Sequence, residues 1–174
     1  MKKAIIITGN LVQDHEFIYP YYRVLEAGFE LDVCIIGGNP VKGILGTSLP
    51  PNKSHEVKDI GDISTDDYSL LILPGGVKSM EKIRQEIKLI NFISEFHKKD
   101  KVIACICSGA QLLISAKVVK GKKIAGYYSM KDDLINAGAI YTDLPAVEDS
   151  KIVTTAHYKD MGPWMKKTLS FFNV

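Results

Sequence analysis

The sequence has no long apolar run and no strong charge of either sign. No segment approaches the roughly 20 apolar residues that a membrane-spanning helix needs. The basic residues at 2–3 precede an apolar run at 4–7 that is too short for a signal peptide. The net charge of +2 supplies no basic field for nucleic acid or a membrane surface. We therefore expect a cytoplasmic protein with neither nucleic acid nor a membrane as a partner.

Cysteine is also scarce. Three cysteines without a secretion signal argue against a disulfide framework. A single residue separates Cys105 from Cys107, so the pair lacks the C-x-x-C spacing of a dithiol redox motif. The sequence also offers no second pair of ligands that would complete a zinc site with them. Cys34 and Cys105 lie within apolar runs and are expected to be buried. A G-x-G-x-x-G dinucleotide motif is missing too, so we predict no metal and no cofactor.

What is present is an alternation of strand and helix patterns. With 174 residues and no linker or repeat, the chain is expected to form one domain over residues 1–174. Apolar β-branched runs alternate with amphipathic helical patterns, which predicts a doubly wound, mostly parallel sheet covered by helices on both faces. Pro20 lies inside one helical pattern, so that helix either kinks or starts near Tyr19. The predicted strands are 3–8, 31–36, 68–73, 102–106, 124–127, 139–141, 147 and 151–155, and the predicted helices are 14–27, 83–97, 110–116, 132–137 and 163–172, with a hairpin or loop at 41–60.

The stretch from Lys101 to Ala116 carries the most informative pattern. The buried strand 102–106 ends at Cys107, and helical spacing begins at Ala110. Such an elbow lifts a side chain above the sheet edge and places it at a helix N-terminus, whose N–H groups favour an anion. We therefore expect the Cys107 thiol to lose its proton more easily than a free thiol, and we interpret it as a nucleophile or redox centre.

Other polar groups follow strands that should end at the same edge. Gly75 and Gly76 come directly after the strand 68–73, where their N–H groups, with that of Ser108, could form an oxyanion hole; a tight turn is the alternative. Glu16 follows the first strand and could hydrogen-bond the sulfur or move a proton, unless it is an ordinary exposed helix residue. His157 follows the strand 151–155 and is either a possible base or an unengaged loop residue.

With these segments together, the chain resembles the ThiJ/PfpI superfamily, which includes the intracellular protease PfpI and the parkinsonism-associated deglycase. The resemblance runs nearly end to end, and its best segments are 16–20 with 26–28, 73–76, 106–116 and 131–139. It implies a flavodoxin-like α/β sandwich with a nucleophile-elbow cysteine, and a homodimer. It also implies that Cys107 is the reactive cysteine, that Glu16 is the acid hydrogen-bonded to it, and that Tyr127 lies at the pocket edge.

The chain departs from this family pattern at several positions. Ser108 stands where protease-like members have histidine, and Ala110 where they have proline. Gln13 replaces a second acid, and the acid that relatives contribute across the dimer would fall near Met80, with Glu81 one residue away. A Cys-His-acid triad is therefore not carried by the sequence, and the remaining Cys-Glu pair is similar to the deglycase branch.

Three functional hypotheses follow. The first is an enzyme in which Cys107 attacks a small electrophile, a reactive carbonyl or acyl compound, with Glu16 moving the proton, as in a glyoxalase, deglycase or hydrolase. The second is a redox-sensing or stress-protective protein whose Cys107 is oxidised to a sulfinate. The third is a PfpI-type intracellular cysteine protease or a ligand-binding pseudoenzyme.

Overall fold

The computed structural model describes residues 2–174 and has a central sheet of seven strands in the order β10-β11-β7-β6-β1-β2-β5. All neighbours in this sheet are parallel except β10, which runs antiparallel to β11 at one edge. The sheet strands are β1 (Lys3–Thr8), β2 (Glu30–Ile35), β5 (Val57–Lys58), β6 (Leu70–Leu73), β7 (Val102–Ile106), β10 (Val147–Asp149) and β11 (Ile152–Thr155).

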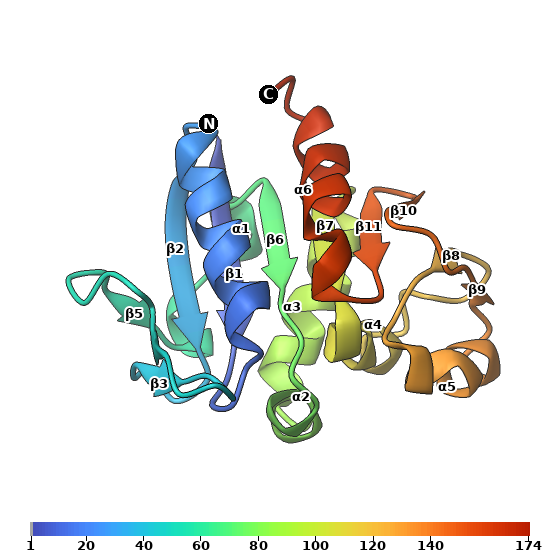
Figure 1. Ribbon diagram of the computed structural model, residues 1–174, viewed down its shortest axis with the longest axis horizontal. Helices are drawn as coiled ribbons and strands as arrows, with labels where there is room; N and C mark the ends of the chain where they lie inside the picture. The colour runs from blue at the N-terminus through green and yellow to red at the C-terminus, as the bar shows by residue number, and fades with distance from the viewer. Residues whose placement is uncertain (1) are drawn as a thin grey trace.

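Helices cover both faces of this sheet, as Figure 1 shows, and the predicted flavodoxin-like α/β fold is confirmed. One apolar cluster packs the sheet against α1 and α6, and the other packs it against α2, α3 and α4. Alternate residues of β1 divide between the two clusters, with Ile6 in the first and Ile5 in the second, because successive side chains of a strand point to opposite faces. The helices are α1 (Asp14–Glu26), α2 (Val77–Ile83), α3 (Ile87–Lys98), α4 (Ala110–Ser115), α5 (Lys131–Asn136) and α6 (Met161–Ser170).

Several predicted elements differ from those in the structure. The helix predicted at 83–97 corresponds to α3 but starts four residues too early, because the Glu86 side chain accepts the Lys88 N–H (3.2 Å) and caps α3. The helix before it, α2, was not predicted. The suggested start near Tyr19 is also wrong: α1 continues through Pro20, which only deprives the Glu16 carbonyl of its usual helical donor.

Two pairs of short strands lie outside the main sheet. The first pair is a hairpin of β3 (Val41–Lys42) and β4 (Ser48–Leu49) in the region 41–60. The same region also supplies β5, an edge strand of the main sheet that no sequence pattern indicated. The strands predicted at 124–127 and 139–141 pair only with each other, as β8 (Lys123–Ile124) and β9 (Ile140–Tyr141). Within residues 2–174 no helix is long and apolar enough to cross a membrane.

The parallel strands end along one edge of the sheet, towards which the arrowheads of β2 and β6 point in Figure 1. Register pairs Leu73 with Cys105 and Thr155 with Ile106, so the turns after β6, β7 and β11 lie next to one another. The start of α1 follows β1 at the same edge. This arrangement brings residues from four distant parts of the sequence together.

Candidate active site

Cys107 lies where β7 ends and a short helical turn leads into α4. Its backbone φ is +60°, in the left-handed region that non-glycine residues seldom adopt. Gly109 keeps this turn tight, because a Cβ atom there would lie 2.8 Å from the Leu73 carbonyl oxygen and 3.0 Å from Cys105 Sγ. The Cys107 carbonyl in turn accepts the Tyr127 N–H at 3.1 Å. The cysteine is therefore held in a strained conformation of the kind found at functional sites.

Glu16 lies beside this cysteine and is completely buried, so it is not an exposed helix residue. Its Oε2 accepts the backbone N–H of Gly75 at 2.7 Å. A Cβ atom on Gly75 would lie 2.5 Å from Glu16 Oε2, 2.9 Å from Cys107 Cβ and 3.0 Å from the Ser108 nitrogen. Only glycine therefore allows the turn after β6 to approach the carboxyl group and the cysteine at once.

Burial changes the protonation of both groups. Desolvation raises the pKa of Glu16 from its ordinary value of 4.5 to about 7, although the Gly75 N–H and the thiol partly oppose the change. Desolvation and the Glu16 charge raise the pKa of Cys107 to about 12, although the Ser108 N–H lowers it. The expectation that this thiol loses its proton easily is therefore wrong, because one amide at the elbow does not outweigh desolvation and an adjacent carboxylate.

The two predicted glycine donors play different parts. The Gly75 N–H donates to Glu16, so it is not available to an oxyanion, and the prediction for that group is wrong. Gly76 lines the cavity beside Cys107, and its φ of +103° favours glycine. A Cβ atom on Gly76 would also lie 2.7 Å from the Gln13 nitrogen. Of the three predicted N–H donors, that of Ser108 lies against the Cys107 sulfur, and Gly76 remains as a residue of the cavity wall.

The cavity in front of Cys107 has a volume of about 390 Å³, which suits a small molecule. It lies between α1, the β3–β4 hairpin, α2, the elbow and the segments around 127–130 and 157–158. Tyr127, 39% exposed, lines it, at the pocket edge as the resemblance implied. Within residues 2–174 no group of three His, Cys, Asp or Glu side chains could hold a metal ion.

His157 lines the same cavity but does not pair with the cysteine. Its Nδ1 accepts the Lys159 N–H at 3.2 Å, so a neutral ring carries its proton on Nε2. The ring packs on Tyr158, with centroids 4.0 Å apart, and on Tyr127 at 6.3 Å. No hydrogen bond joins His157 to Cys107 in the described part of the chain, so the structure forms a Cys-Glu pair without a histidine.

The β3–β4 hairpin forms one wall of this cavity, which the sequence analysis did not predict. Asp14, buried at the start of α1, accepts the N–H groups of Leu45 (2.8 Å) and Thr47 (2.9 Å). These bonds hold the hairpin so that Ile44 lines the cavity. An acidic residue in the first turn of a helix ordinarily indicates only a helix start, so the sequence carries no separate signal for this contact.

A model of the DJ-1/PfpI family matches residues 2–170. The chain belongs to the DJ-1/PfpI family. Among similar family proteins, the chain is 32% identical over 165 residues to deglycase PfpI of Pyrococcus furiosus, covering 95% of this chain and 96% of that protein. It is also 32% identical over 171 residues to general stress protein 18 of Bacillus subtilis, covering 97% and 96%. The structure of DJ-1beta from Drosophila melanogaster has the same fold (TM-score 0.87, 22% identity, 98% of this chain and 90% of that chain).

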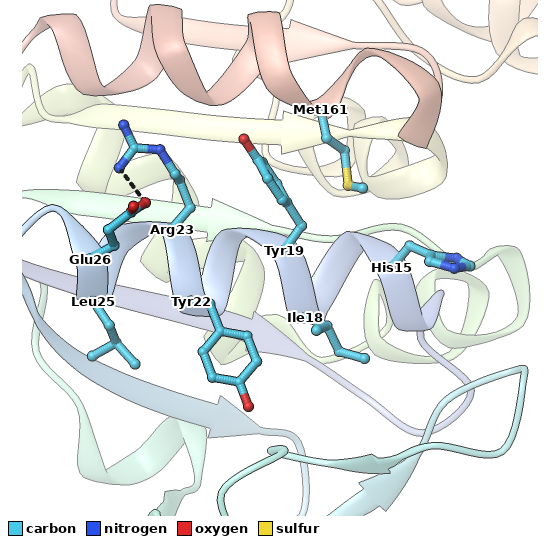
Figure 2. Close-up of a pocket in the computed structure, with 8 residues that line it drawn as sticks. All are labelled: His15, Ile18, Tyr19, Tyr22, Arg23, Leu25, Glu26 and Met161. Carbon is cyan, nitrogen blue, oxygen red and sulfur yellow. Dashed lines mark hydrogen bonds and ion pairs between the residues drawn. The ribbon is translucent and has the colours of Figure 1, made fainter.

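A second, larger hollow of about 740 Å³ lies along the outer face of α1, beside Met161 at the start of α6. Figure 2 shows Ile18, Tyr22 and Leu25 pointing outward from α1, with Met161 across from Tyr19. Its charged residues are Arg23 and Glu26, which pair with each other at 3.2 Å. The hollow contains neither Cys107 nor Glu16, which both line the smaller cavity.

Proposed function

We propose that the protein is a cysteine-dependent enzyme that acts on small reactive carbonyl compounds, of which a 2-oxoaldehyde is the representative substrate. The observation that carries this proposal is the contact between the Cys107 thiol and a buried carboxyl group, Glu16, whose pKa is about 7. A general base is most effective when its pKa is near the working pH. Glu16 is therefore suited to take the thiol proton at the moment of attack, although the resting thiol is not ionised.

The first step conserves atoms and electrons. The sulfur forms a bond to the aldehyde carbon as the S–H proton passes to the Glu16 carboxylate, and the carbonyl electron pair moves onto oxygen. The N–H groups of Gly76 and Ser108 are the proposed donors to this oxyanion. Glu16 then returns the proton to the oxygen, which gives a hemithioacetal and regenerates the carboxylate.

From a 2-oxoaldehyde the reaction can then continue without an oxidant. Glu16 removes the proton from the carbon attached to sulfur and delivers it to the neighbouring carbon, while the hydroxyl proton of the hemithioacetal passes to the neighbouring oxygen. The hemithioacetal thereby becomes the thioester of a 2-hydroxy acid. Water cleaves the thioester to a 2-hydroxy acid and restores the thiol. The net change is addition of one water to the 2-oxoaldehyde.

Peptide hydrolysis has less support. Cleavage of an amide requires an acid that protonates the leaving nitrogen, a role that histidine fills in Cys-His enzymes. His157 makes no hydrogen bond to Cys107, and Ser108 occupies the adjacent position. A cavity of about 390 Å³ also favours a small substrate over a polypeptide.

The redox hypothesis has less support than carbonyl chemistry, because burial raises the pKa of the Cys107 thiol and so disfavours its thiolate. Peroxide reacts with the thiolate, and its rate follows the thiolate fraction. Because burial and the Glu16 charge raise the pKa of Cys107 to about 12, the resting protein holds little thiolate at neutral pH. Attack on a carbonyl compound does not require thiolate in the resting protein, because Glu16 takes the thiol proton during the attack.

The test is the conversion of methylglyoxal to lactate by purified protein. We expect Cys107→Ala to abolish turnover and Glu16→Gln to lower kcat by about 10² or more, the ordinary contribution of a general base. Cys34→Ala, at a buried thiol outside the cavity, and Glu26→Gln, at an exposed carboxylate of the same helix, are the matched controls. Equal rates for the wild type and Cys107→Ala would overturn the proposal.

We also propose that the chain acts as a homodimer, as the family resemblance implies. The support is the outer face of α1, where Tyr22 is 54% exposed and Leu25 is 40% exposed beside the hollow of Figure 2. Exposed apolar patches of this kind are typical of association surfaces. Sedimentation at micromolar concentration should give twice the chain mass of 19.3 kDa, and a mass of one chain would contradict the proposal.

A further inference from the structure

The side chain of Ser108 has no role in the proposed chemistry, which uses only the backbone N–H of this residue. Ser108 lines the Cys107 cavity and is 4% exposed. Within residues 2–174 its Oγ is one of six buried side-chain oxygen or nitrogen atoms that have no hydrogen-bond partner. Buried hydroxyl groups are normally paired, so an unpaired one beside a reactive group points to a partner that forms during the reaction.

The hydroxyl group of Ser108 lies beside the Cys107 sulfur. Ser108 follows the cysteine in the elbow, and the point that a Cβ atom on Gly75 would occupy is 2.9 Å from Cys107 Cβ and 3.0 Å from the Ser108 nitrogen. Both the N–H and the hydroxyl of Ser108 lower the pKa of the thiol, as groups that donate towards the sulfur do. In the resting site, however, the hydroxyl does not complete a hydrogen bond.

The charge state of the sulfur explains why this contact stays incomplete. At rest Cys107 is a neutral thiol that is hydrogen-bonded to the Glu16 carboxyl group. The sulfur of a neutral thiol is only a weak acceptor. A thiolate carries a full negative charge, and a hydrogen bond to an ionised group is roughly twice as strong as one between neutral groups. The contact should therefore become a hydrogen bond when the thiol proton moves to Glu16.

Position separates Ser108 from the other buried hydroxyl groups without a partner. Those of Thr8, Ser79 and Thr155 are also deeply buried, but none of these residues lines the cavity. Within residues 2–174 the other unpaired buried atom of a cavity residue is Glu16 Oε1. The two residues beside the sulfur thus provide one unpaired acceptor and one unpaired donor.

We infer that Ser108 is a further catalytic residue of this site, whose hydroxyl group donates a hydrogen bond to the Cys107 thiolate as Glu16 takes the thiol proton. The inference rests on the proposed function, to which it adds the group that stabilises the charge developing on sulfur. The S–H proton goes to Glu16, the electron pair stays on sulfur and then forms the bond to the substrate carbon, and Ser108 keeps its own proton. Because this hydrogen bond forms only as charge develops, it lowers the barrier without tightening the binding of substrate.

The experiment measures alkylation of Cys107 by iodoacetamide, which is followed at this residue by peptide mass spectrometry and requires no turnover. The titratable groups around the sulfur are Glu16, Cys105, Tyr127, His157 and Tyr158. Rates are measured from pH 8 to pH 9.5, above the Glu16 pKa of about 7, so that this carboxyl group stays ionised. Over this range the rate should follow the thiolate fraction and rise about tenfold per pH unit.

Two substitutions at one position isolate the hydroxyl group. Ser108→Ala removes it and keeps the backbone N–H, so we expect a rate that is lower by about tenfold or more at every pH in this range, the effect of one lost hydrogen bond to a charged group. Ser108→Thr keeps a hydroxyl group and should restore most of the wild-type rate. Ser79→Ala removes a hydroxyl that is equally unpaired and buried but lies outside the cavity, and this matched control should leave the rate unchanged.

The direction of the change separates this role from a structural one. Looser packing beside Cys107 would expose the thiol and raise its labelling rate, whereas loss of a donor lowers that rate. A rate in Ser108→Ala equal to or above that of the wild type would overturn the inference, and so would a rate in Ser108→Thr as low as that in Ser108→Ala. Failure of the proposed function is seen separately, as wild-type protein that forms no lactate from methylglyoxal. Thermal unfolding of each variant confirms that the comparison is made between folded proteins.

Discussion

Replacing Glu16 by glutamine tests the central physical feature of the site, a carboxyl group that loses its hydration when the chain folds. The substitution preserves size, and the glutamine oxygen can still accept the Gly75 N–H that Glu16 accepts at 2.7 Å. What it removes is the possibility of a charge at a completely buried position. Its effect on stability should therefore depend on pH.

The sign follows from the direction of the pKa change. Burial raises the pKa of Glu16 from 4.5 to about 7, so between these values the folded protein binds more protons at this residue than the unfolded chain. The resulting stabilisation is fully present below pH 4.5 and is lost as the pH rises through about 7. Each pH unit corresponds to about 1.4 kcal/mol, and most of the interval between the two pKa values is crossed between pH 5 and pH 8, so the loss over this range is roughly 2–3 kcal/mol.

Urea unfolding of the wild type and Glu16→Gln at pH 5 and pH 8 measures this difference. Relative to the wild type, the variant should be more stable at pH 8 than at pH 5, with a free energy of unfolding larger by roughly 2–3 kcal/mol. Glu26→Gln, at an exposed residue of the same helix, should show no such change. A difference between wild type and Glu16→Gln that is the same at both pH values would refute the reasoning that desolvation controls this carboxyl group.

Three further predictions concern the same site. The kcat/KM for methylglyoxal should rise about tenfold per pH unit up to about pH 7 and then level off, because ionised Glu16 is the base; a flat profile from pH 5 to 9 would contradict this role. Gly75→Ala should destabilise the fold by about 1–3 kcal/mol and lower kcat, as its Cβ would lie 2.5 Å from Glu16 Oε2; unchanged urea unfolding would contradict the tight approach. Asp14→Ala should cost on the order of 2 kcal/mol and raise KM, because two N–H groups of the hairpin that carries Ile44 lose their acceptor; kinetics identical to the wild type would exclude the hairpin as a working wall.

The arrangement also has a cost for stability. The form of Glu16 that acts as a base is the ionised form, and that is the form that burial disfavours. Stability and activity therefore change in opposite directions as the pH rises through about 7. Such an opposition is common where a function depends on a destabilised group.

Much of the fold could be predicted from the sequence because its determinants are local. The four apolar runs that form β1, β2, β6 and β7 are patterned within themselves, and each was predicted to within one or two residues. The two-residue strand β5, the helix α2 and the start of α3 at Ile87 were not predicted. A two-residue strand has no period, α2 spans only seven residues, and the start of α3 depends on a single capping contact of Glu86.

By itself, the sequence determined which chemical groups meet at the sheet edge. A short apolar strand followed by Cys107, and a glycine pair after β6, place a thiol and flexible backbone at the carboxyl ends of neighbouring parallel strands. That much depends on residue type and on alternation along the chain, both of which can be read without a structure.

Only the tertiary structure decided how those groups behave. Gly75 and Glu16 are 59 residues apart, and their hydrogen bond removes one N–H from the expected oxyanion hole. The same packing takes the carboxyl group and the thiol out of water, so the pKa of each rises and the cysteine is poised for activation by its neighbour instead of being ionised at rest. Desolvation is the sum of contacts from every element around a group, and no local stretch of sequence contains that sum.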